Sequence, residues 1–290
     1  MALGRFIRHL RLQFQLILAP VFLLGYKLTG ATLELHFVGL FLLVHIGLYG
    51  GMTAFNSYYD RDEGPIGGMK FPPPADKLER NGGLFLQLAA VGAMAFWGWS
   101  MALAGLVIFG LGVAYSHPRW RWKARPLGSL LAVALGQGVL PFLMGTAAAK
   151  ESSGRVGSVE MVLAASATAI IITGLYPLTQ VYQIVEDRRR GDCTLAVYWG
   201  ADRIFLFARS LMGLGLAAMF FFAFVVDIFH HFWLWVLPPG YLIFWYVVRS
   251  WAGRFARQTA YQNHDWAFAT SLGTSGAFWL FLAIEFIYPA

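Results

Sequence analysis

One short polar stretch sets the interpretation of this chain: Asn56-Ser57-Tyr58-Tyr59-Asp60-Arg61-Asp62-Glu63-Gly64-Pro65. It lies at the end of a long apolar run and brings three acids there. A second cluster ends another apolar run: Gln183-Ile184-Val185-Glu186-Asp187-Arg188-Arg189-Arg190-Gly191-Asp192. The chain has only 15 Asp and Glu residues, and six of them fall in these two pieces. We therefore expect the two clusters to face each other across one cavity.

The composition around these clusters is that of a membrane protein. The chain has 290 residues and is 58% hydrophobic, with a mean hydropathy of +0.58. Only 13% of its residues are charged, against about a quarter in a soluble domain. Continuous apolar windows of about 20 residues recur, which predicts membrane-spanning helices and not the alternating strands, roughly ten residues long, of a membrane β-barrel. The single cysteine, Cys193, excludes an internal disulfide framework.

The apolar windows predict an all-α, polytopic membrane protein with about nine transmembrane helices. The expected spans are 12–28, 36–59, 83–100, 102–116, 128–148, 159–185, 204–226, 231–248 and 267–288. The third and fourth are nearly continuous, and Gly105 with the small residues around it would allow a tight turn there. No soluble domain, long linker or low-complexity tail interrupts the pattern, so we expect a single transmembrane domain over residues 1–290.

The basic residues indicate how this bundle is oriented. If the N-terminus is cytoplasmic, 19 of the 22 Lys and Arg residues fall on the cytoplasmic side, and only Lys27, Lys150 and Arg155 remain for the other. An excess of this kind over short loops is typical of cytoplasmic loops in membrane proteins. The net charge of +7 therefore reflects topology and does not indicate a nucleic-acid partner. Both acidic clusters are expected on the cytoplasmic side.

The first cluster has the residue types of a magnesium site. In a helix, Asn56 and Asp60 lie at positions i and i+4 and share one face. Asp62 and Glu63 follow where the helix ends at Gly64-Pro65. Amide and carboxylate oxygens suit Mg²⁺, and an acid within a membrane segment costs about 2.5–3.5 kcal/mol, so such acids are usually functional. The alternative for these residues is an ordinary solvated helix end.

The second cluster has the same character. Gln183, Glu186 and Asp187 lie at positions i, i+3 and i+4, so they also share a helix face. Two carboxylate clusters at matching membrane depth are more specific than either one alone. The alternative is a helix end followed by a basic loop that sets the topology.

Together the two clusters resemble a known family. The pattern Asn-x-x-x-Asp-x-Asp begins at Asn56, and Asp-x-x-x-Gly-x-x-Thr-Leu follows at Asp187, about 125 residues after Asp62. The pair resembles the motifs of the UbiA superfamily of intramembrane prenyltransferases, and the similarity covers nearly the whole chain. It implies a helical bundle around a central cavity, where two aspartate-rich motifs bind Mg²⁺ and the diphosphate of an isoprenyl donor. By position, Asn56, Asp60 and Asp62 match the first motif, and Asp187 matches the last acid of the second.

The sequence departs from the family pattern at three positions. Ser57 and Gly64 stand where the family usually has Asp, and Gln183 replaces an acid in the second motif. Asp62, Glu63 and Glu186 would compensate as oxygen ligands displaced by a residue or two. The chain therefore resembles a divergent member, with a ligand set of Asn56, Asp60, Asp62, Glu63, Gln183, Glu186 and Asp187.

Further residues are expected around the diphosphate. Lys70, Lys123 and Arg125 would contact its oxygens, and the alternative for each is a topology-setting charge. The Tyr115-Ser116 pair, which precedes the basic stretch from Arg119 to Arg125, resembles a third segment of the family. Tyr59 and Tyr182 would line the cavity and face a carbocation through their rings.

The expected reaction is the Mg²⁺-dependent transfer of an isoprenyl group to a lipophilic, aromatic acceptor within the membrane. Asp60, Asp187 and Tyr182 would be its catalytic residues, with Asn56, Tyr59 and Gln183 binding the substrate. A terpene cyclase of the same superfamily, which would use no acceptor, is an open alternative. A cation or proton carrier is a third hypothesis, although the chain shows no paired halves. The dense Asp-Gly and Ala-Arg motif of a CDP-alcohol phosphotransferase is not found.

Overall fold

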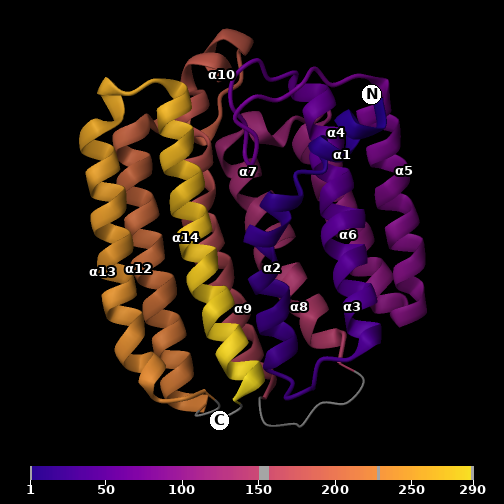
Figure 1. Cartoon of the computed structure of the whole chain (residues 1–290), viewed down its shortest axis with the longest axis vertical. Helices are drawn as coiled ribbons and strands as arrows, with labels where there is room; N and C mark the ends of the chain where they lie inside the picture. The colour runs from indigo at the N-terminus through magenta and orange to yellow at the C-terminus, as the bar shows by residue number, and fades with distance from the viewer. Residues whose placement is uncertain (1, 150–156, 227–228, 289–290) are drawn as a thin grey trace.

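The computed structural model describes residues 2–149, 157–226 and 229–288, and these form an upright bundle of helices (Figure 1). Within these ranges there are nine long helical segments and no β-strand, which confirms the all-α fold. The only extended pairing among the described residues is an isolated bridge between Ile66 and Met69. Seven of the segments are long and apolar enough to cross a membrane. The other two, α5 and α13, stand at the outer edges of the bundle (Figure 1).

The first half of the chain supplies five of these segments. They are α1 (Ala2–His9) with α2 (Leu12–Lys27); α3 (Leu35–Leu42), η1 (Leu43–Gly50) and α4 (Gly51–Asp60); α5 (Lys77–Met94) with η2 (Ala95–Trp97); α6 (Trp99–Ser116); and α7 (Pro126–Val133), η4 (Ala134–Val139) and α8 (Leu140–Ala147). The segments η1 and η4 are π-helical stretches inside otherwise α-helical spans. Such stretches are rare and often mark functional positions.

The second half supplies the other four. They are α9 (Ser158–Leu175), which continues through η5 (Tyr176–Thr179) and η6 (Val181–Gln183) into α10 (Ile184–Arg190); α12 (Ala201–Val226); α13 (Phe232–Arg254); and α14 (Ala260–Ile287). The short α11 (Leu195–Trp199) connects α10 to α12, and η7 (Phe255–Arg257) follows α13. The surface along these helices is apolar, with Phe224, Trp235 and Leu242 among its exposed side chains. This is the surface expected of a protein surrounded by lipid tails.

Two of the expected boundaries near α5 were wrong. The span expected at 83–100 begins earlier, at Lys77, because a capping box closes its first turn. The Asp76 side chain accepts from Leu78 N (2.7 Å), and the Glu79 side chain accepts from Asp76 N (2.7 Å). The turn expected near Gly105 lies instead at Gly98, where φ is +125°. A side chain disfavours that backbone conformation, so glycine marks the turn.

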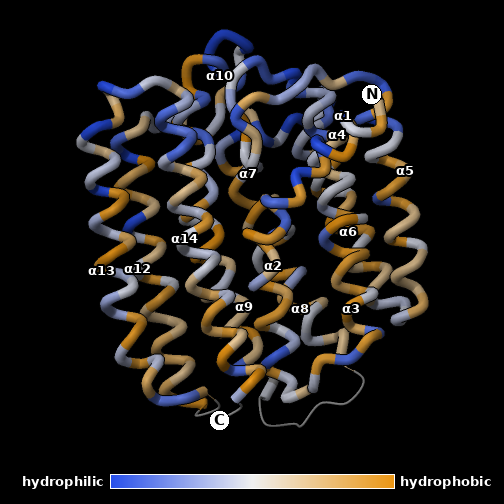
Figure 2. The backbone as a smooth tube through the Cα atoms, in the orientation of Figure 1, coloured by the Kyte–Doolittle hydropathy of each residue, from blue (hydrophilic) through white to orange (hydrophobic). Residues whose placement is uncertain are grey.

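The polar connections gather at one end of the bundle. The N-terminus, α10 and the chain after α4 lie together there, and the C-terminus lies at the opposite end (Figure 1). Figure 2 shows hydrophilic residues concentrated at the end that carries α10, above a mostly apolar body. An odd number of crossings requires the two termini to be at opposite ends. The two acidic clusters are therefore at the same end of the bundle, as the sequence predicted.

Candidate active site

The first cluster is presented by the end of α4. Asn56 and Asp60 are one turn apart on this helix, and both line a central cavity. The helix stops at Arg61, which has left-handed backbone angles (φ +49°, ψ +44°) and donates from its N–H to Ser57 O (3.1 Å). Asp60 is thus the last helical residue, and its carboxylate is buried at the mouth of the cavity. Asn56 Nδ2 donates to Ser116 Oγ (3.1 Å) and so ties α4 to the end of α6.

Two basic residues from the segment between α6 and α7 hold Asp60. Lys123 Nζ lies 2.7 Å from Asp60 Oδ1, and Arg121 Nη1 lies 3.2 Å from the same atom. Arg121 also binds Asp192 of the second cluster, with Nη2 2.6 Å from Oδ2. Lys123 Nζ is 3.6 Å from Asp192 Oδ2. One pair of cations therefore links the carboxylates of the two clusters.

The second cluster is built around Asp187 on α10. Asp187 is 3% exposed, and its Oδ2 accepts a hydrogen bond from Thr194 Oγ1 (3.1 Å). Gly191, with φ of +77°, ends α10 in the left-handed conformation and lets Asp192 N donate back to Asp187 O (2.9 Å). This turn aims the Asp192 carboxylate at Arg121. Gly191 and Thr194, the Gly and Thr of the second motif, therefore shape this turn and hold the Asp187 carboxylate.

A second set of contacts joins the two clusters directly. Arg190 Nη1 lies 2.6 Å from Asp62 Oδ1, and Arg190 also pairs with Glu186 one turn earlier on α10. Glu186 in turn accepts from the backbone N–H groups of Glu63 (2.8 Å) and Gly64 (3.2 Å). We call Asp62, Glu186 and Arg190, with these two amides, the interloop latch. The latch fixes the chain that follows α4 against α10.

The charges at this mouth compensate one another. Burial and the neighbouring Asp60 charge raise the pKa of Asp62, although Lys123 and Arg190 oppose this. Burial acts to lower the pKa of Lys123, but the charges of Asp60 and Asp62 outweigh it and raise that pKa. Burial acts to raise the pKa of Asp192, but its hydrogen bonds from Arg121 and the nearby positive charges lower it overall. The site therefore retains both signs of charge in a partly dry environment.

A cavity of about 210 Å³ leads from these side chains into the bundle. Its polar lining comes from both clusters and from the basic residues near them: Arg11, Asn56, Asp60, Asp62, Lys123, Gln183, Asp187 and Thr194. Farther in, the walls are apolar and come from α2, α6, α7, α9, α12 and α14, for example Leu18, Ile108, Val133, Ile172, Met219 and Phe278. The cavity thus combines a charged mouth with an interior suited to a hydrocarbon chain.

Several of the expected site residues do not line this cavity. Lys70 is 2.6 Å from Asp265 on α14, and Arg125 is exposed. Glu63 and Glu186 belong to the latch, and the Glu63 side chain is exposed. The rings of Tyr59 and Tyr182 pack against His117 and His264, respectively. The roles suggested for these residues from the sequence stay predictions, and the structure brings Asn56, Asp60, Asp62, Gln183, Asp187 and Lys123 together at the cavity.

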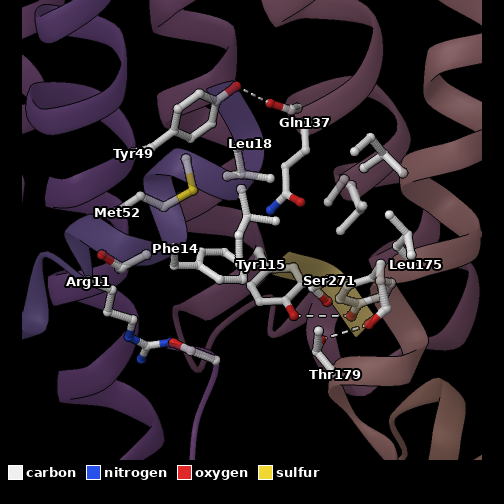
Figure 3. Close-up of a pocket in the computed structure, with 18 of the residues that line it drawn as sticks. Arg11, Phe14, Leu18, Tyr49, Met52, Tyr115, Gln137, Leu175, Thr179 and Ser271 are labelled. Atoms are coloured by element: carbon white, nitrogen blue, oxygen red, sulfur yellow. Dashed lines mark hydrogen bonds between the residues drawn. The ribbon is translucent and has the colours of Figure 1, made fainter. Parts of the chain in front are cut away.

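Arg11 is a cavity residue that the sequence did not single out. It joins α1 to α2 with left-handed backbone angles (φ +49°, ψ +52°). Its guanidinium is buried, and Nη2 donates to Ser57 Oγ (2.8 Å). Figure 3 shows Arg11 among the side chains that line the cavity. Among the described residues no carboxylate lies within ion-pair distance of Arg11. Its partner Ser57 stands where the family pattern has Asp. That substitution was the feature of the sequence that could have pointed to Arg11.

Gln137 is the second residue that was missed. It lies on the π-helical stretch η4, and its amide points into the cavity (Figure 3). The signal was a lone amide inside the otherwise apolar span expected at 128–148. Polar groups at membrane depth are costly unless they are paired, so their presence favours a functional position.

The oxygen atoms at the mouth suit a hard divalent cation. Carboxylates from Asp60, Asp62 and Asp187, with the amides of Asn56 and Gln183, are the donor types that Mg²⁺ prefers. Within the described ranges no three His, Cys, Asp or Glu side chains form a ready metal cage. Mg²⁺ commonly takes only one or two carboxylates and fills its remaining positions with water and phosphate oxygens. The donor set therefore fits a magnesium ion that is bound together with a phosphate-bearing ligand.

The fold and the site thus define an all-helical membrane protein with a paired-acid site at one end of its bundle. The UbiA prenyltransferase family matches residues 17–272, and the chain belongs to this family. With that membership and its long apolar helices, it is an integral membrane protein. A search of curated proteins gives no match.

Solved structures share the fold over nearly the whole chain. A UbiA homolog from Archaeoglobus fulgidus bound to DMAPP and Mg²⁺ has a TM-score of 0.69 and 18% identity, covering 98% of this chain and 99% of that one. The same homolog bound to GPP and Mg²⁺ has a TM-score of 0.68 and 20% identity, with the same coverage. A structure of digeranylgeranylglyceryl phosphate synthase has a TM-score of 0.64 and 15% identity, covering 98% and 97% of the two chains. At these identities the likeness concerns the fold.

Proposed function

We propose that this protein transfers an isoprenyl group from an isoprenyl diphosphate to a lipophilic acceptor, in a reaction that depends on Mg²⁺. One observation carries the proposal: carboxylates and cations from three separate segments converge on the mouth of a cavity that is otherwise apolar. A diphosphate needs the charged mouth, and an isoprenoid tail needs the apolar interior. The homologous structures bound to DMAPP or GPP with Mg²⁺ support the same assignment.

The acids and amides of the mouth are proposed to hold the metal. Asp60, Asp62 and Asp187 would supply carboxylate oxygens, with Asn56 and Gln183 as neutral donors beside them. When bound, Mg²⁺ neutralises the diphosphate and stabilises it as a leaving group.

The basic side chains are proposed to bind the diphosphate oxygens. Lys123 is buried at the mouth and already lies between Asp60 and Asp192, so its charge is directed to the place where the leaving group would gain charge. Arg121 and Arg11 present planar guanidinium groups, which suit two adjacent phosphate oxygens.

The interior of the cavity is proposed to hold the isoprenoid chain and exclude water. The bond between the allylic carbon and the diphosphate oxygen breaks, and its electron pair leaves with the diphosphate. A nucleophilic atom of the acceptor then forms the new bond to that carbon and afterwards loses its proton. Apolar walls such as Ile108, Val133 and Met219 keep water from trapping the allylic cation.

The charged end of the bundle is proposed to face the cytoplasm. This end carries the N-terminus, α10 and most of the basic residues, in keeping with the 19-to-3 distribution of Lys and Arg. Reporter fusions to the N-terminus and to the connection between α4 and α5 should both report a cytoplasmic location. A periplasmic or luminal signal from either fusion would contradict this orientation.

The decisive experiment incubates the purified protein in nanodiscs with geranyl diphosphate and Mg²⁺, with and without candidate acceptors. Prenylated product and released diphosphate are measured together. Asp60→Ala and Asp187→Ala should each abolish Mg²⁺-dependent turnover, whereas Asp202→Ala should preserve it, because Asp202 is exposed and lies outside the cavity. Near-normal turnover in either of the first two variants would refute the site. A cyclic hydrocarbon formed without acceptor would show instead that the protein is a terpene cyclase.

A further inference from the structure

The charged end of the α12–α13 pair carries three arginines that contact aromatic rings. Arg209 on α12 lies over the Trp245 ring of α13, with its Cζ 5.5 Å from the ring centroid. Arg249, about one turn beyond Trp245 on α13, lies over the same ring at 5.4 Å. Arg254 lies over Trp266 of α14 at 5.7 Å. Three cations from two helices therefore gather at the outer edge of the bundle that α12 and α13 form (Figure 1).

These arginines keep hydrogen-bond donors that the protein does not use. Over residues 2–149, 157–226 and 229–288, no carboxylate lies within ion-pair distance of Arg209, Arg249 or Arg254. Arg209 Nε donates to Phe205 O (3.2 Å), and over the same residues the other two guanidinium groups make no hydrogen bond. A ring covers only the face of a guanidinium, so the N–H groups at its edge stay available. An anionic ligand would use these donors and relieve the repulsion between the like charges.

A groove on the surface of α13 lies beside these charges. Its lining consists of Trp245, Tyr246, Arg249, Ser250, Gly253 and Arg254. Gly253 lines the groove without filling it, since a Cβ at this position would meet no atom within 4 Å. Glycine weakens a helix relative to alanine, and neither close packing nor a positive φ requires it here. None of the lining residues belongs to the central cavity, so the groove is a separate site.

The depth of this groove matches the boundary between lipid headgroups and lipid tails. Arg254 is the last residue of α13, and Arg249 lies five residues earlier, about 7.5 Å farther from the charged end. Arg209 lies eight residues into α12, about 12 Å from its start. Tryptophan is enriched at this level of a membrane, and long basic side chains extend from it to the surface. Farther along α13, Leu242 and Ile243 are exposed and offer an apolar surface to acyl chains.

We propose that this groove binds the phosphate headgroup of an anionic phospholipid from the surrounding leaflet. The edge N–H groups of Arg209 and Arg249 donate to the phosphate oxygens, and Arg254 adds a third positive charge nearer the membrane surface. The acyl chains lie along the exposed apolar side chains of α13. This inference is independent of the proposed function, because the groove shares no residue with the central cavity.

The alternative for these arginines is a role in setting the topology, since Lys and Arg are enriched at the cytoplasmic ends of membrane helices. Such a role requires only positive charge near the end of a span. It explains neither the two arginines over one tryptophan ring nor the unfilled groove beside them. A lipid also fits better than a free anion, because the groove continues onto an apolar surface.

The test compares ligands that differ in headgroup charge or in the presence of acyl chains. Purified protein in a nonionic detergent is titrated with dioctanoyl phosphatidylglycerol, dioctanoyl phosphatidylcholine or inorganic phosphate, and thermal unfolding gives the apparent affinity for each. Phosphatidylglycerol should stabilise the protein saturably. Phosphatidylcholine has the same chains and no net charge, so it should bind at least about fivefold more weakly. Inorganic phosphate has no chains and should give no comparable stabilisation.

Variants of the groove show whether the lipid binds there. Arg249→Gln should weaken phosphatidylglycerol binding about fivefold, and Arg209→Gln combined with it about 25-fold, because each basic residue near the membrane surface contributes about fivefold. Gly253→Leu keeps every charge and fills the groove, so it should weaken binding to a similar extent. Arg257→Gln and Gly273→Leu are matched controls, because both residues are exposed and lie outside the groove. Both controls should keep the wild-type affinity.

Three results would overturn the inference. Equal stabilisation by the two lipids, or none by phosphatidylglycerol, would show that the protein does not select an anionic lipid. Full stabilisation by inorganic phosphate would show an anion site that needs no lipid. Wild-type affinity for phosphatidylglycerol in either the double arginine variant or Gly253→Leu would place the lipid elsewhere. If the arginine variants do not fold, Gly253→Leu and its glycine control decide the question.

Discussion

Arg11 offers the sharpest test of how this site binds an anion. Its guanidinium is buried, donates to Ser57 Oγ and to Gly67 O (3.5 Å), and has no carboxylate within ion-pair distance among the described residues. Its Nε has no hydrogen-bond partner there either. The charges of Asp62 and Asp60 offset only part of the desolvation cost of this buried cation, and a bound anion would offset more of it. We therefore expect Arg11→Met to weaken donor binding strongly without harming the ligand-free protein.

The magnitude follows from the number of hydrogen bonds lost. Each hydrogen bond to a charged group contributes about 1.5–3 kcal/mol, so two bonds from the guanidinium to phosphate oxygens contribute at least about 3 kcal/mol. Since each 1.4 kcal/mol is a factor of ten, donor affinity should fall roughly a hundredfold. At a donor concentration of about 100 times the wild-type Kd, ligand stabilisation is about 2.7 kcal/mol for the wild type. For the variant it should fall to about 0.4 kcal/mol.

Thermal unfolding in nanodiscs or detergent, with and without geranyl diphosphate and Mg²⁺, measures both quantities. Without ligand, Arg11→Met should be at least as stable as the wild type, because an unpaired buried charge has been replaced by an apolar side chain of similar length. With ligand it should lose most of the upward shift in Tm. Arg8→Met is the control, since Arg8 is exposed on α1 and lies outside the cavity. It removes the same charge and should keep the full shift.

Two results would refute this reasoning. If Arg11→Met binds the donor within about threefold of the wild type, the guanidinium does not contact the diphosphate. If the variant unfolds without ligand at a much lower temperature than the wild type, Arg11 is a structural residue. Its hydrogen bonds to Ser57 and Gly67 would then be its main role.

Two further predictions concern the turn and the latch. Thr194→Val removes the hydroxyl that binds Asp187 and caps α11, so it should destabilise the protein by about 1–2 kcal/mol in thermal unfolding. Thr194→Ser keeps the hydroxyl and should not destabilise the protein. A Val variant as stable as the wild type would contradict the assigned role. Arg190→Gln should loosen Glu186 and speed hydrogen exchange at the Glu63 and Gly64 amides by about fivefold, in line with roughly 1 kcal/mol for a largely buried ion pair near the surface. The exposed neighbour Arg189, changed to Gln, is the control, and equal exchange rates in the two variants would rule out the latch.

Local relations within each helix could be predicted from the sequence. Asn56 and Asp60 share a face because four residues make about one helical turn, and this holds whatever surrounds them. The apolar runs likewise predicted the helical segments, because only a helix satisfies its own backbone across a membrane. The start of α5 was missed because the two acidic residues that cap it, Asp76 and Glu79, lie before the apolar run. The apolar pattern marks where a span is hydrophobic and not where its helix begins.

Relations between distant segments could not be predicted in this way. Lys70 was expected at the diphosphate, and it pairs with Asp265 because α14 lies beside the chain after α4. The sequence contains no sign of that proximity. In the same way, Lys123 and Arg125 looked equivalent as basic residues two positions apart. The 3₁₀ turn η3 (Trp122–Ala124) buries Lys123 and leaves Arg125 exposed, so only the folded chain separates them.

The balance of charge at the mouth explains how so many ionised groups can be buried there before a substrate arrives. Each carboxylate of the mouth faces a cation or a hydroxyl: Asp60 and Asp192 face Arg121 and Lys123, Asp62 faces Arg190, and Asp187 faces Thr194. A diphosphate with bound magnesium also carries both signs of charge. Its arrival would let the carboxylates exchange their cations for the metal while the cations turn to the phosphate oxygens. Because both states are paired, we infer that binding changes partners without leaving an isolated buried charge.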